Sequence, residues 1–112
     1  MTLPARLKQP KLREPKQLRS PAHLAWVRSH KCCVPDCDLL PIEAAHVRTG
    51  TDGGTGLKPS DFWTISLCGV HHRQQHLIGE REFEIYNGID MKALAQEFAS
   101  KSPVLRNRRS RA

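Results

Sequence analysis

Two short apolar runs predict the β-strands of this chain. The first, at 42–47, reads Ile-Glu-Ala-Ala-His-Val and is apolar at four of its six positions. The second, at 62–67, reads Phe-Trp-Thr-Ile-Ser-Leu and is rich in aromatic and β-branched side chains, which favour strands. Residues 49–59 contain four glycines, which indicate a flexible loop. The pattern therefore predicts two strands joined by a long loop.

Capping residues and helical spacing predict helices on both sides of these strands. The first helix begins after Ser20, a good N-cap, with Pro21 at its first position, and runs to about Ser29. The second follows the second strand directly, over 69–78, and Gly79 is a natural C-terminal stop.

Two further helices are expected after that glycine. One covers 80–86 and ends at the Asn-Gly pair before residue 89. The other covers 91–100, with Asp90 as its N-cap, and Pro103 prevents it from continuing. Strands and helices in this order predict an α+β fold.

Proline and charge divide the chain into three parts. Residues 1–20 form a basic, proline-rich N-terminal arm and residues 101–112 a basic C-terminal tail, and we expect both to be disordered. The globular domain is then 21–100. A domain this small buries too little apolar surface to offset its chain entropy comfortably, so we expect a bound metal to stabilise it.

The net charge of +7 is unevenly distributed. The arm and the tail each carry +5, whereas the domain between them carries −3. Basic segments at both ends of an acidic domain favour binding to the phosphates of a nucleic acid. The alternative is that these charges only keep the chain in solution.

No stretch has the pattern of a signal peptide, because no apolar run of about 7 to 15 residues follows the basic N-terminus. Nothing approaches the length of a membrane-spanning helix. We therefore expect the four cysteines to be reduced and free to bind metal, as in an intracellular protein.

Two close-spaced pairs of metal ligands predict a structural zinc site. Cys33 and Cys37 are one pair, and Cys68 and His71 are the other. Tetrahedral zinc commonly takes its ligands as two such pairs from distant segments. Cys32 is an alternative to Cys33, since adjacent cysteines do not easily bind the same ion. We favour Cys33.

A second metal site is expected at His72 and His76. Residues four apart lie on one face of a helix, so both imidazoles can bind one ion. His71 points about 100° away from His72 on a helix with 3.6 residues per turn. The adjacent histidines can therefore serve two different metals.

This pattern resembles the HNH, or ββα-metal, endonuclease family, and more closely its small phage and bacterial members that carry a zinc knuckle. The resemblance extends from Cys33 to Gly79. The motifs that match are Cys33-x3-Cys37, Ala45-His46-Val47-Arg48, the glycine-rich loop and Cys68-x2-His71-His72-x3-His76.

The resemblance implies a β-hairpin followed by a helix around one divalent metal. His46 would be the general base that takes a proton from the attacking water. His72 and His76 would hold the catalytic metal, such as Mg²⁺, Mn²⁺, Ni²⁺ or Zn²⁺. Arg48 and Lys58 would neutralise charge on the phosphate.

The chain departs from the family pattern at two positions. Family members often have His or Asp before the general base, as a further metal ligand, and here that residue is Ala45. Asp61 stands near the place of the family's middle residue, usually Asn. Three roles are open for Asp61: orienting His46 through a hydrogen bond, binding the metal, or capping a turn.

The expected function is metal-dependent cleavage of DNA, with RNA as an alternative substrate, in the cytoplasm of a bacterial or phage-infected cell. A protein partner in recombination or packaging is a further expectation. The competing hypothesis is a zinc-stabilised nucleic-acid-binding module without catalysis. Basic tails that bind phosphates carry no base code, so the sequence does not specify a target site.

Overall fold

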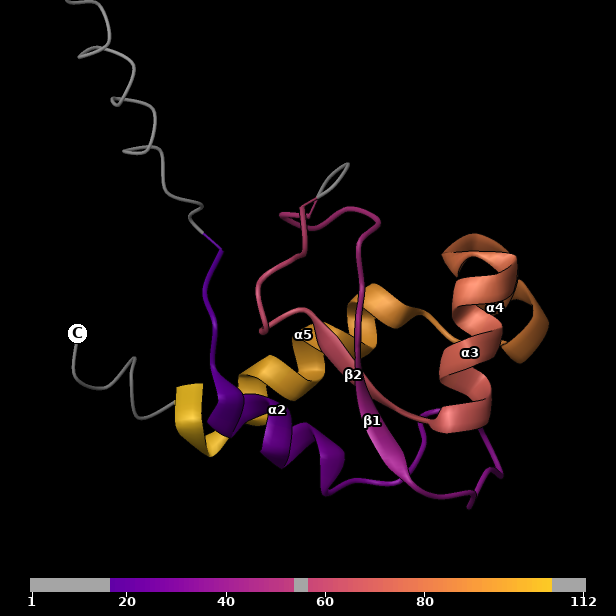
Figure 1. Cartoon of the computed structure of the whole chain (residues 1–112), viewed down its shortest axis with the longest axis horizontal. Coiled ribbons are helices and arrows are strands. Elements are labelled where there is room, and N and C mark those ends of the chain that lie inside the picture. The colour runs from indigo at the N-terminus through magenta and orange to yellow at the C-terminus, as the bar shows by residue number, and fades with distance from the viewer. Residues whose placement is uncertain (1–16, 54–56, 106–112) are drawn as a thin grey trace, which may run out of the picture.

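The computed structural model describes residues 17–53 and 57–105 (Figure 1). The predicted arm and tail therefore lie largely outside the described residues. The elements in chain order are α2 (Pro21–Arg28), β1 (Ile42–His46), β2 (Thr64–Cys68), α3 (Gly69–Ile78), α4 (Glu80–Asn87) and α5 (Met91–Lys101). A β-hairpin followed by helices is an α+β fold, which confirms the predicted fold class.

The two strands form an antiparallel pair at the centre of the molecule. The register runs from Ile42 opposite Cys68 to His46 opposite Thr64. Every residue of β2 is buried, because α2, α3 and α5 all contact it. Figure 1 shows α3 and α4 at one side of the hairpin, and α2 and α5 at the other. The end of β1 therefore lies beside the helix that carries the predicted metal ligands.

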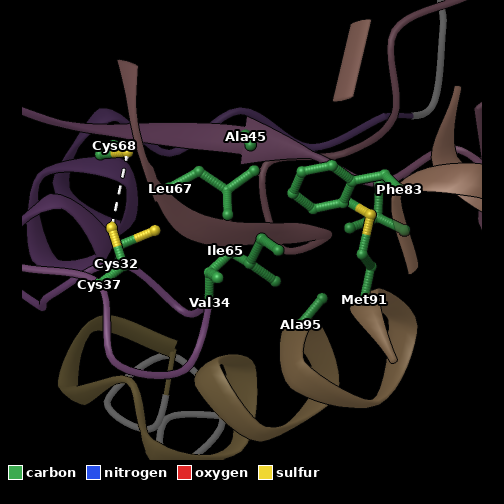
Figure 2. Close-up of a cluster of buried hydrophobic side chains, with 11 residues drawn as sticks. Cys32, Val34, Cys37, Ala45, Ile65, Leu67, Cys68, Phe83, Met91 and Ala95 are labelled. Carbon is green, nitrogen blue, oxygen red and sulfur yellow. Dashed lines mark hydrogen bonds between the residues drawn. The ribbon is translucent and has the colours of Figure 1, made fainter. Parts of the chain in front are cut away.

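The core is built from the buried residues of both strands and of the last two helices (Figure 2). Ile65 and Leu67 of β2 pack with Phe83 of α4, and with Met91 and Ala95 of α5. All five side chains are fully buried. Alternation along β1 adds Ala45 and Val47 to this core but leaves His46 partly exposed.

The capping residues act as the sequence predicts. The Ser20 side chain accepts a hydrogen bond from the His23 N–H, and Asp90 accepts one from the Ala93 N–H. Helix α3 covers the predicted range and ends at Gly79, whose φ is +88°. That left-handed φ is one that glycine adopts without steric cost.

The second strand begins two residues later than predicted. Residues 61–63 form a turn, in which the Trp63 N–H donates to Ser60 O and the Thr64 hydroxyl donates to Asp61 O. The aromatic pair before Thr64 therefore belongs to this turn.

The described parts of the predicted arm and tail pack against the domain. The Leu18 N–H donates to Ser60 Oγ, and the Asp61 N–H donates to Leu18 O. Beyond α5, residues 103–105 form a helical turn; Leu105 in this turn and Ser102 just before it are buried. No helix in the described part of the chain is both long and apolar enough to cross a bilayer.

Candidate metal centre and histidine cavity

Four potential metal ligands meet where the hairpin joins α3. Cys32 and Cys37 come from the turn after α2, Cys68 ends β2, and His71 lies in the first turn of α3. Their ligand atoms all lie within 4.8 Å of one another. Figure 2 shows the three sulfurs together at one end of the core, with a dashed line between Cys37 and Cys68.

The distances within this cluster match a tetrahedral zinc site. Zn–S bonds of about 2.3 Å and Zn–N bonds of about 2.1 Å would place two sulfurs about 3.8 Å apart, and a sulfur and a nitrogen about 3.6 Å apart. The sulfurs of Cys37 and Cys68 are 3.9 Å apart. The Nδ1 atom of His71 lies 3.6, 3.5 and 3.3 Å from the sulfurs of Cys32, Cys37 and Cys68. All four cysteines are free thiols, so the cluster fits a structural zinc.

Cys33 was the wrong choice between the adjacent cysteines. Its backbone N–H donates to Ser66 O at 2.9 Å, and its sulfur lies 3.5 Å from Ser66 Oγ. This hydrogen bond holds the backbone alongside β2, where neighbouring side chains point to opposite sides. Cys32 therefore faces the cluster, and Cys33 faces α5 beside Leu94. The other three predicted zinc ligands are in the cluster.

A tight turn brings Cys37 back to Cys32. The Cys37 N–H donates to Val34 O at 3.2 Å, and Asp36 has a φ of +64°. Aspartate tolerates this left-handed conformation better than most residues.

Burial affects the Cys32 and Cys68 thiols of the cluster differently. Burial raises the pKa of Cys32 to about 11, although backbone N–H groups of Cys68 and Val34 lower it in part. Burial also acts to raise the pKa of Cys68, but hydrogen bonds, first of all from the His71 N–H, leave that pKa below its ordinary value. Zinc supplies the charge that stabilises buried thiolates of this kind.

His72 and His76 form a second pair of imidazoles on α3. Their Nε2 atoms are 3.3 Å apart, and the ring centroids are 4.9 Å apart. Two nitrogens that bind one ion at about 2.1 Å lie about 3.0 to 3.4 Å apart. The pair therefore has the nitrogen spacing of two ligands of one divalent metal, and a metal at these residues stays a prediction.

Glu43 orients this pair, and the sequence analysis did not identify it. Its Oε1 atom accepts a hydrogen bond from His72 Nδ1 at 2.6 Å. A proton held on Nδ1 leaves the Nε2 lone pair of His72 for a metal. The available signal was a charged side chain inside an otherwise apolar strand.

His46 and Asp61 form a hydrogen-bonded pair. His46 Nε2 lies 2.9 Å from Asp61 Oδ1. The same oxygen accepts from Arg19 at 3.3 Å, and the other accepts from the Ser20 N–H at 2.7 Å. Asp61 is 3% exposed, and both its oxygens are occupied. Of its three open roles, the geometry matches orientation of His46.

The environment favours a neutral His46. Burial lowers the pKa of His46, and the nearby Lys58 and Arg19 lower it further, although the Asp61 hydrogen bond opposes them. Burial would raise the pKa of Asp61, but its hydrogen bonds, led by that from His46, leave it below the ordinary value. A neutral His46 that donates to this carboxylate carries its proton on Nε2. Nδ1 keeps its lone pair and can act as a base.

One cavity of about 530 Å³ connects these groups. Its lining includes His46, His72 and His76 together with Arg48, Lys58 and Arg81. The structure thus brings together the predicted general base, the predicted metal pair and the two predicted phosphate-neutralising residues. Asp61 lies behind His46.

Two contacts hold the walls of this cavity. The amide of Gln75, which is buried between His72 and His76 on α3, donates to His46 O at 3.3 Å. The carboxylate of Glu80 accepts from the backbone N–H groups of Arg48 and Thr49, at 2.7 and 2.9 Å. The first contact joins α3 to the end of β1, and the second joins α4 to the residues that follow β1.

The cavity does not contain a third ligand atom as close as the first two. Within 17–53 and 57–105, the Cys₃His cluster is the sole group of three or more His, Cys, Asp or Glu residues whose ligand atoms all lie within 4.8 Å. His46 lines the same cavity as the His72–His76 pair but does not form such a group with it.

The fold and the buried cluster define a small α+β protein with a Cys₃His site that fits a structural zinc. The chain belongs to the family described as a protein of unknown function (DUF968), whose family model matches residues 4–102. Searches of curated proteins and of solved structures gave no significant match.

Proposed function

We propose that this protein is a metal-dependent endonuclease of the HNH type that hydrolyses phosphodiester bonds in DNA. One observation carries the proposal: a histidine hydrogen-bonded to a carboxylate and a pair of histidines with the spacing of metal ligands line the same cavity. A cavity with these groups has the parts that hydrolysis of a phosphodiester requires, namely a base, a metal site and positive charge.

His46 is the general base in this proposal. Its Nδ1 atom takes a proton from water, and the oxygen of that water attacks the phosphorus as the bond to the 3′-oxygen breaks. Asp61 keeps the opposite nitrogen protonated, so that the lone pair is on Nδ1. Asp61 also stabilises the imidazolium that forms.

His72 and His76 would hold the divalent metal, and the hydrogen bond from His72 Nδ1 to Glu43 would leave the Nε2 lone pair of His72 available to it. When bound, such an ion supplies Lewis-acid stabilisation of negative charge on the phosphate and on the leaving oxygen. Arg48 and Lys58, on the cavity wall, add positive charge for the substrate phosphate.

The distribution of charge supports a nucleic acid as the substrate. The residues before position 21 and after position 100 each carry a net charge of +5. Binding through such residues releases counterions from the phosphates, so affinity should fall steeply as salt rises.

Incubation of supercoiled plasmid with Mg²⁺, Mn²⁺ or Ni²⁺ tests the proposal. The wild type is expected to produce nicked or linear plasmid, and His46→Ala is expected to lose at least about a hundredfold in rate, because it lacks the base. His30→Ala is the matched control, since His30 lies beside Trp26 away from the cavity. Equal cleavage by His46→Ala and wild type would exclude this role for His46.

A zinc-stabilised nucleic-acid-binding module is the second candidate. The observation in its favour concerns the second metal site. That site has a pair of histidines, and Ala45 cannot supply a further ligand. The two functions differ in one outcome. Plasmid that is bound and shifted on a gel, but not cut with any of the three metals, would support the binding module.

A further inference from the structure

We propose that Arg19 is a positioning residue that holds the Asp61 carboxylate in place behind His46 and offsets its charge. The consequence for catalysis rests on the proposed function, whereas the geometric role of Arg19 does not. Because Arg19 lies among the basic residues at the start of the chain, the sequence groups it with the phosphate-binding arm.

The guanidinium of Arg19 binds three oxygen atoms of the loop before β2. Nη1 donates to Pro59 O and to Asp61 Oδ1, the latter at 3.3 Å, and Nη2 donates to Lys58 O at 3.1 Å. A planar fork with several donors suits such a set of oxygens in a way that the single ammonium of lysine does not. The Arg19 side chain is 44% exposed, and its charged end is bound to the domain.

Arg19 belongs to the 17–20 segment, which packs against the loop before β2. Leu18, immediately before Arg19, pairs with this loop through two hydrogen bonds: its N–H donates to Ser60 Oγ, and its carbonyl oxygen accepts from the Asp61 N–H. The Ser20 N–H then donates to Asp61 Oδ2 at the start of α2, where the helix dipole favours an anion. The 17–20 segment is therefore part of the wall that fixes Asp61.

Asp61 needs this compensation because it is almost fully buried. A buried carboxylate with His46 as its only partner would favour a protonated, positively charged imidazole. Arg19 and the Ser20 N–H satisfy the carboxylate from the other side, and Arg19 also lies close enough to oppose a positive charge on His46. His46 is thereby kept neutral and able to accept a proton.

Other charged groups around His46 also influence its titration, so they are left unchanged in every variant. They are Lys58 and Asp61 of the loop, Arg48 after β1, His72 and His76 of α3, and Glu80 and Arg81 of α4. Of these residues, Arg19 hydrogen-bonds to Asp61 and to the backbone oxygen of Lys58.

An NMR titration of the His46 imidazole, in the zinc-loaded full chain without DNA or added metal, tests the proposal. The His46 signal is assigned by its loss in His46→Ala. Arg19→Met keeps the length of the side chain but removes its charge, and an upward shift of the His46 titration is expected. Arg19→Lys keeps a charge and should titrate closer to wild type.

Arg28→Met is the matched control, because Arg28 is exposed at the far end of α2 and should leave the titration unchanged. Arg19→Gln replaces the methionine variant if that variant does not fold. A folded, uncharged variant at position 19 with an unshifted His46 titration would overturn the proposal.

Plasmid cleavage then separates this inference from the proposed function. If the wild type cuts, the low-pH limb of the cleavage rate should move to higher pH in Arg19→Met, while Arg28→Met follows the wild type. If the wild type does not cut but the titration shifts, the endonuclease proposal fails and the role of Arg19 stands.

Discussion

At the scale of single residues, neighbouring side chains in this protein have different roles. Cys32 faces the zinc-type cluster while Cys33 contacts Ser66, and His71 faces that cluster while His72 lines the cavity. The different roles of His71 and His72 follow from helix geometry and were predictable. The different roles of Cys32 and Cys33 depend on a backbone hydrogen bond between Cys33 and β2. Ligand spacing does not reveal this contact between distant segments.

Replacement of Cys32 or Cys33 by serine tests which of the two is a ligand of the cluster. Cys32→Ser removes a cluster ligand, so it should lose zinc and unfold at a lower temperature. Its free energy of unfolding should fall by at least about 2 kcal/mol. Cys33→Ser should keep its zinc and change stability by less than about 1 kcal/mol, because Cys33 is half-buried beside Ser66. Zinc content and thermal unfolding check both variants, and the reverse ranking would restore Cys33 as the ligand.

At the scale of elements, local signals predicted most boundaries and long-range contacts moved the others. Ser20, Gly79 and Asp90 act through bonds within their own helix or turn, so their positions in the sequence were sufficient. The start of β2 was misplaced because residues 61–63 turn to meet the 17–20 segment, which is far away in sequence.

One contact between elements predicts a pH dependence of stability. His23 of α2 is fully buried, and its Nδ1 lies 2.8 Å from Ser102 Oγ, while its Nε2 has no partner. Burial lowers the pKa of His23, although Asp61 opposes this in part. The unfolded chain therefore binds a proton more readily than the folded one. Stability should be complete above about pH 6.5 and should fall as the pH drops from there toward the lowered pKa.

His23→Gln isolates this effect. Glutamine does not titrate, so the free energy of unfolding of the variant should change less than that of the wild type between pH 7 and pH 5. The zinc ligands are the same in both proteins, so their acid sensitivity cancels in the comparison. Urea unfolding at several pH values provides the measurement, and parallel curves for the two proteins would contradict the assignment.

At the scale of the whole molecule, histidines and cysteines form two separate groups, the Cys₃His cluster and the histidines of the cavity. The Cys₃His cluster joins the turn after α2 to the hairpin and α3, where the apolar core alone is small. The cavity lies on the other side of α3, between the end of β1 and the start of α4. The sequence predicted both groups from ligand spacing, but it missed Glu43 and the role of Arg19. Those two side chains act through contacts across the fold.

We propose that His71 and His72, although adjacent, serve two separate metal sites. Zinc content per chain, measured after extensive dialysis of the wild type and of His72→Ala, tests this claim most directly. We expect one tightly bound zinc in both proteins, because the four cluster ligands remain in the variant. Loss of that zinc in His72→Ala would contradict the division into a structural cluster and a working cavity.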